Sequence, residues 1–185
     1  MAGISFADIK KEFDESLGYI QNDISALCGQ DQTVNYTVAL LVLIGCEVLA
    51  EGRGDRKRPH DVFAELLPDN DWKALAKPLY EALRNGLTHK FDTKHLHVDG
   101  QSIQIYFGWT LEQVVGIHSA NRGTGLFISP RPLGERLCAR IDEFRRELET
   151  DERLREHFSR AYGRESTTEC STSETAAWKR LIASR

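Results

Sequence analysis

The feature that most constrains the fold of this chain is a segment that is apolar on nearly every side. The run from Val38 to Cys46 contains no charged residue, and after Glu47 the apolar character continues to Ala50. The run itself is shorter than the roughly 20 apolar residues that a helix needs to span a bilayer. We therefore predict a buried central helix from about Thr33 to Glu51, around which the rest of the chain packs.

Apolar residues at steps of three and four predict further helices around this central one. The clearest runs from Phe6 to Leu27, with charged residues on its opposite face. A second runs from Trp72 to His89, and Pro78 is expected to kink it or divide it in two. Other helices are expected at Val62–Leu67, after Pro132, and from about Thr150. The chain is therefore predicted to be mainly helical.

The apolar period changes in the segment that follows His89. Lys94–Val98 and Ser102–Phe107 flank the dipeptide Asp99-Gly100, which tight type I′ hairpin turns favour. We predict a β-hairpin there, with a third short strand at Leu126–Ile128. The expected organisation is one helical domain, residues 1–163, with a β insertion at about 94–129 and a flexible tail at 164–185.

Composition limits the classes of function. A net charge of -4 does not support a protein that coats DNA. The start of the chain has no basic segment followed by an apolar run, so no secretory signal is recognised. The four cysteines are widely separated and are expected to be reduced thiols. These features favour a soluble, cytoplasmic protein with no membrane association.

The most concentrated chemical signal is Arg84-Asn85-x-x-x-His89, late in the helix predicted at Trp72–His89. Asn85 and His89 are four residues apart and share a helical face. Histidine can transfer protons near neutral pH, and arginine can bind a phosphate with a permanently charged planar fork. Asparagine can orient the histidine or donate to a phosphate oxygen. This set of side chains suits phosphate-ester cleavage without a metal or other cofactor.

Residues Leu83–His89 resemble the Arg-Asn-x-x-x-His signature of the HEPN superfamily. The surroundings are also similar, because a helical hairpin with an acid in its apolar helix, Glu47, precedes the motif helix. The resemblance implies a four- or five-helix bundle and a homodimer. It also implies metal-independent RNA cleavage by Arg84, Asn85 and His89. Families of this kind act in toxin–antitoxin, phage-defence or RNA-processing systems, so an antitoxin or regulatory protein is a further expected partner.

Two groups of residues are expected to support the motif. Glu47 lies in an apolar helix, where an unpaired carboxylate is costly, and Arg84 is the candidate partner. That pair could orient a catalytic arginine or simply join two helices. A glycine-containing loop also carries four basic residues that are candidate RNA contacts or an ordinary basic surface loop: Arg53, Arg56, Lys57 and Arg58. The arginines after Arg131 alternate with glutamates and predict a solvated helix face.

Other interpretations of the same residues remain open. Arg84 and His89 could merely satisfy the last carbonyls of a helix, in a catalytically inactive HEPN-like module that dimerises or binds a partner or nucleotide. His95 and His97 share a strand face and could form a metal pair, but no third ligand lies at suitable spacing, so no metal site is predicted. A DNA-binding regulator is the weakest alternative, because no basic recognition helix is present.

Overall fold

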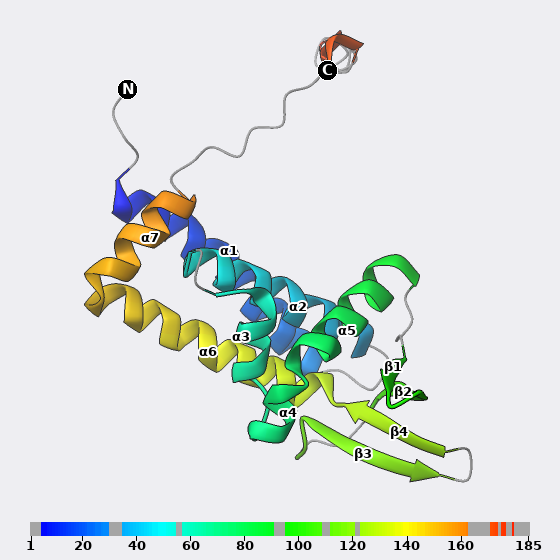
Figure 1. Ribbon diagram of the computed structural model, residues 1–185. Helices are drawn as coiled ribbons and strands as arrows, with labels where there is room; N and C mark the ends of the chain where they lie inside the picture. Colours follow the sequence, from blue (N-terminus) through cyan, green and yellow to red (C-terminus); the bar gives the residue numbers. More distant parts are fainter. Residues whose placement is uncertain are drawn as a thin grey trace.

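The computed structural model describes residues 5–29, 35–54, 57–90, 95–108, 112–120 and 123–162, with a few residues between 171 and 179. Within these ranges the side chains of residues 88–90, 118–120, 123 and 124 are outside the description. The described chain forms helices and a small mixed sheet (Figure 1). The prediction of a mainly helical protein with a β insertion after the motif helix is therefore confirmed at this level.

Helix α2 (Asn35–Gly52) is the centre of the helical part. It contacts five other helices: α1 (Phe6–Cys28), α3 (Pro59–Glu65), α5 (Ala76–Lys90), α6 (Pro130–Thr150) and α7 (Glu152–Tyr162). Its buried side chains include Val42, Cys46 and Leu49, which confirms the predicted central position. Taken over all 18 residues, rather than over the uninterrupted apolar run, α2 has a mean hydropathy of 1.4. It is thus the one described helix long and apolar enough to cross a membrane, although core helices of soluble proteins share this pattern.

The helix predicted at Trp72–His89 is divided by Pro78, as anticipated. Helix α4 (Asn70–Ala74) is followed by its C-cap residue Leu75, and α5 (Ala76–Lys90) begins immediately afterwards. The proline ring would clash with the carbonyl group four residues earlier, at Ala74. Within the first turn of a new helix, the missing N–H of Pro78 has no such cost.

Helix α3 (Pro59–Glu65) begins three residues before the predicted start at Val62. Proline is favoured at the first helical position, and the backbone N–H of Arg58 donates to Asp61 Oδ2 at 2.8 Å. These local signals start the helix at Pro59, ahead of the apolar residues from which the prediction was made.

The predicted hairpin is present as β1 (Leu96–Val98) and β2 (Gln101–Phe107). Asp99 and Gly100 have φ values of 49° and 77°, the positive values that a type I′ turn needs at both central positions. The third predicted strand is part of β4 (Gly123–Ile128). A strand that was not predicted, β3 (Val115–Ala120), completes the sheet order β1-β2-β4-β3, in which β4 is parallel to β2 and antiparallel to β3.

The turn glycine provides a conformational prediction. A Cβ added to Gly100 meets no atom within 4 Å, so Gly100→Ala changes only the backbone preference at positive φ. We expect it to destabilise the protein by about 1 kcal/mol. Gly18 in α1 also has open space around it and lacks a positive φ. Gly18→Ala should therefore stabilise the protein, by up to about 1 kcal/mol. Urea unfolding of both variants should give shifts of opposite sign.

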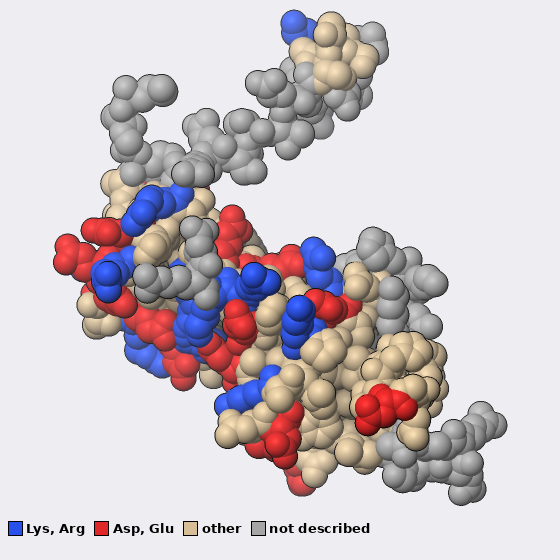
Figure 2. Space-filling view, viewed as in Figure 1, with Lys and Arg blue, Asp and Glu red and all other residues tan. Residues whose placement is uncertain are grey.

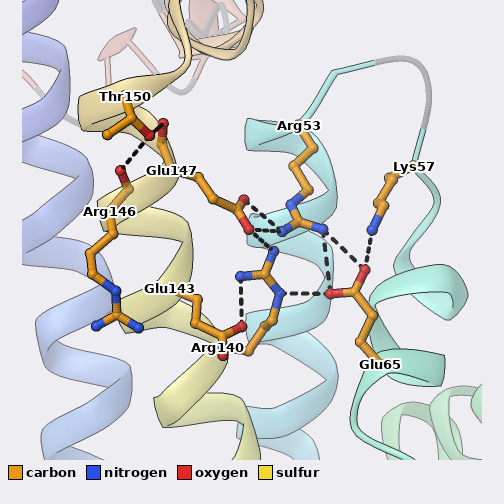
Figure 3. A network of polar contacts seen from close by, with 8 residues as sticks. All are labelled: Arg53, Lys57, Glu65, Arg140, Glu143, Arg146, Glu147 and Thr150. Carbon is orange, nitrogen blue, oxygen red and sulfur yellow. Dashed lines mark hydrogen bonds and ion pairs between the residues drawn. The ribbon is translucent and has the colours of Figure 1, made fainter.

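A network of ion pairs joins α2, α3 and α6 (Figure 3). Glu65 accepts from Arg53 at 3.1 Å, from Arg140 at 2.6 Å, and from Lys57. Glu147 accepts from Arg53 and from Arg140, both at 2.8 Å. The two arginine side chains are each only 9% exposed. The prediction of a solvated arginine face on α6 is therefore wrong for Arg140, because α3 and the end of α2 cover it.

Candidate functional site

The motif residues lie in the second half of α5. Leu79, Leu83 and Leu87 of this helix are buried in the core. Arg84, the residue after Leu83, points away from the core. The Arg84 side chain is 55% exposed, and Asn85 is partly exposed. His89 belongs to the last turn of α5 by its backbone, but its side chain lies outside the described residues. Helical spacing alone relates His89 to Asn85, one turn earlier.

Glu47 and Arg84 form the pair that the sequence predicted between α2 and α5. Arg84 Nε donates to Glu47 Oε1 at 2.7 Å. This hydrogen bond, together with the charge of Glu47, raises the pKa of the Arg84 guanidinium above its ordinary value. The expectation that Glu47 is buried is wrong, because its side chain is 42% exposed at the edge of α2. An ion pair this exposed contributes about 0–1 kcal/mol to stability, and it directs the Nε of Arg84 toward α2.

Tyr80 is a member of this cluster that the sequence analysis missed. Its hydroxyl donates to the same Glu47 oxygen at 3.1 Å, and its ring lies edge-on to Phe63 with centroids 5.8 Å apart. Tyr80 is only 5% exposed. Burial, followed by the charge of Glu47, raises the pKa of the phenol, so it stays protonated and acts as a donor. Its spacing of four residues from Arg84 places both on one helical face, a signal that could have identified it.

The four basic candidates for RNA contact separate in the structure. Arg53 is held inside the network of Figure 3, and its guanidinium lies 5.6 Å from the centre of the Phe144 ring. Its low exposure argues against a role as a surface contact, and we withdraw it from the candidates. Lys57 pairs with Glu65 and is 37% exposed. Arg58 is exposed at the start of α3, and Arg56 lies outside the described residues.

Charges of both signs are mixed over the helical part of the face seen in Figure 2. Over the sheet, the same view shows mainly uncharged side chains. No broad basic surface is visible on this face. Binding of a nucleic-acid phosphate to this face would thus depend on individual basic side chains rather than on a general positive field.

Among the described residues, no group of three or more His, Cys, Asp or Glu side chains is arranged to hold a metal ion. His95 and His97 are both exposed, before and within β1. Cys28, Cys46 and Cys138 are free cysteines. Cys46 is buried, and this burial raises the pKa of its thiol, so it behaves as a core residue rather than a nucleophile.

Comparisons with known proteins give no match to this chain, whether with family models, curated proteins or solved structures. The Arg84 cluster and the resemblance of its motif are therefore the features that indicate a function.

Proposed function

We propose that this protein is a metal-independent RNA endonuclease that acts through Arg84, Asn85 and His89. The observation that carries the proposal is the environment of Arg84. The side chain is 55% exposed, yet a carboxylate of a neighbouring helix binds its Nε at 2.7 Å. An exposed arginine whose Nε is bound by a carboxylate, five residues before a histidine, suits recognition of a phosphate.

In the proposed reaction, the 2′-hydroxyl of RNA attacks the adjacent phosphorus atom. His89 removes the hydroxyl proton or protonates the departing 5′ oxygen. Arg84 binds the non-bridging oxygens, on which negative charge increases in the transition state. Asn85 orients His89 or donates to the phosphate. The products are a 2′,3′-cyclic phosphate and a free 5′-hydroxyl, and no step needs a metal ion or other cofactor.

We further propose that the enzyme is a homodimer with the two motifs close together. One helix end supplies a single arginine and a single histidine from the motif. A second copy would place another proton-transfer group and another cation around the same phosphate. The HEPN resemblance supports this arrangement, and it also motivates a cytoplasmic role in a toxin–antitoxin, phage-defence or RNA-processing system.

The direct test of the role of Arg84 is Arg84→Lys, assayed with purified protein and mixed RNA in the presence of EDTA. Lysine keeps the charge but loses the planar fork and the Nε that binds Glu47. We expect the cleavage rate to fall on the order of a hundredfold, the scale of losing one oriented donor. The matched control is Arg131→Lys, because Arg131 is 48% exposed on α6 and pairs only locally with Glu135 in the contacts described. Equal rates for the two variants would count against the proposal.

The alternative function is a catalytically inactive HEPN-like module that dimerises or binds a partner or nucleotide. The Glu47–Arg84 and Glu47–Tyr80 contacts favour this alternative, because both join α2 to α5 and a purely structural role would explain them. In that case the parent protein would leave RNA intact. The Arg84→Lys protein would also leave RNA intact and would fold like the parent.

A further inference from the structure

The face of the sheet opposite the hydrophobic core carries two aromatic side chains on neighbouring strands. Successive side chains of a strand point to opposite faces of the sheet. Ile105 of β2 and Leu126 and Ile128 of β4 are buried in the core, so they define the inner face. Tyr106 and Phe127 alternate with them and lie on the outer face, where they are register partners in the parallel pairing of β2 with β4.

A glycine allows the Tyr106 ring to lie along the sheet. A Cβ added to Gly125 would be 2.6 Å from Tyr106 Cε2, so the ring occupies the space above Gly125. The Tyr106 hydroxyl donates to Gln104 Oε1 at 2.5 Å. Gln104 precedes Tyr106 by two residues on β2 and is the register partner of Gly125. The ring therefore leans back along β2 and over β4, and it is still 44% exposed.

Phe127 lies over two further glycines. A Cβ added to Gly116 of β3 would be 2.4 Å from Phe127 Cε1 and Cζ. A Cβ added to Gly108, directly after β2, would be 2.7 Å from Phe127 Cδ2. The ring thus extends over the backbone on both sides of β4 and is partly exposed. Tyr106 and Phe127 together form an aromatic platform on the outer face.

The rest of the described outer face is polar and carries no Asp, Glu, Lys or Arg. Ser102 and Gln104 share this face of β2 with Tyr106, and His97 of β1 lies opposite Ser102. All three side chains are exposed. Hydroxyl, amide and imidazole groups form hydrogen bonds with the edges of bases. The absence of carboxylates from this part of the face also avoids repulsion of phosphates.

We propose that the aromatic platform stacks on unpaired bases of the RNA that the Arg84 motif cleaves. Aromatic side chains on a sheet surface commonly bind single-stranded RNA in this way. The bases of a duplex are already stacked on each other, so the substrate is single-stranded where it crosses the platform. β1 contacts α5, so the sheet adjoins the helix that carries the motif (Figure 1). The choice of RNA as the ligand rests on the proposed function.

Binding of a labelled single strand of 2′-O-methyl RNA to the full chain tests the platform. This strand lacks the nucleophilic hydroxyl, so binding is measured without cleavage. Tyr106→Leu should weaken binding about fivefold or more, the scale of losing one stacked base. Tyr106→Phe keeps the ring and should bind like the parent. The matched control is Tyr19→Leu, at a 71% exposed tyrosine of α1, which should also bind like the parent. A duplex of the same chemistry should bind at least about fivefold more weakly than the single strand.

Photochemical cross-linking of the parent protein keeps the test informative if Tyr106→Leu folds poorly. A 2′-O-methyl strand that contains iodouridine should become joined, under ultraviolet light, to the peptides that contain Tyr106 or Phe127, as located by mass spectrometry. Failure of the parent to bind the strand, cross-links at other peptides only, or equal affinities of Tyr106→Leu and Tyr19→Leu would overturn the proposal. Equal binding of the duplex would do the same.

The platform and the proposed function fail in different ways. A parent protein that binds the strand through Tyr106 but leaves RNA intact would support the platform and exclude the nuclease. A protein that cleaves RNA, and whose Tyr106→Leu variant binds the strand as tightly as the parent, would do the reverse.

Discussion

Replacing His89 by alanine is expected to reduce RNA cleavage by about a hundredfold to ten-thousandfold, the usual cost of losing a general acid or base. No other residue of the motif can transfer a proton near neutral pH, because the hydrogen bond and charge of Glu47 hold Arg84 in its charged form and asparagine does not titrate. The measurement is a time course of cleavage of a labelled RNA, with the parent protein alongside.

The His89→Ala protein should fold normally. His89 lies in the last turn of α5, where one substitution removes little helical structure. The control is His97→Ala, because His97 is an exposed histidine of β1. Its substitution should leave the rate within about twofold of the parent, the small change expected of a residue with no part in proton transfer. A His89→Ala protein that cleaves as fast as His97→Ala, with an unchanged circular dichroism spectrum, would remove histidine from the mechanism.

Glu65→Ala is expected to destabilise the fold by about 3 kcal/mol, the lower end of the cost of breaking a buried ion pair. Glu65 binds Arg53 and Arg140, whose side chains are 9% exposed, and is itself 27% exposed. Without this carboxylate, two largely buried guanidinium groups share Glu147 as their main counter-charge (Figure 3). The loss should appear in urea unfolding as a lower midpoint with an unchanged slope.

Glu143→Ala is the matched control for this effect. Glu143 binds the same Arg140 at 3.2 Å, but its side chain is 55% exposed. An exposed partner contributes about 1 kcal/mol or less. If both substitutions lowered stability equally, burial of the arginines would not explain the contribution of the network to the free energy of unfolding. Neither variant touches the Arg84 cluster, so cleavage by the folded fraction should be unchanged.

The sequence was most informative where local pattern decides structure. The bounds of α1 and the central position of α2 follow from apolar spacing, and the division at Pro78 follows from backbone chemistry. The turn at Asp99-Gly100 likewise needs only local preferences. The pairing of Glu47 with Arg84 was predicted from the cost of an isolated carboxylate, although the pair lies at the surface.

The features that were missed depend on contacts between distant segments. Arg140 alternates with glutamates like its solvated neighbours, and only the approach of α2 and α3 buries it. β3 contains Gly116, which weakens a strand signal, but the Phe127 ring lies so close that any added Cβ would overlap it. The parallel pairing of β2 with β4 joins strands separated by β3 in the sequence. A periodic pattern within one segment cannot predict such a pairing between distant segments.

Cleavage of an RNA that carries one deoxynucleotide, with EDTA present, most directly tests the claim that this chain is a metal-independent ribonuclease. The strand should first be mapped so that its preferred cleavage position is known. The all-RNA strand should be cut there and leave a 2′,3′-cyclic phosphate, because the 2′-hydroxyl is the nucleophile. A strand whose nucleotide at that position lacks this hydroxyl should resist at that position alone. Loss of all cleavage in EDTA, or equal cutting of the deoxy-substituted position, would contradict the account.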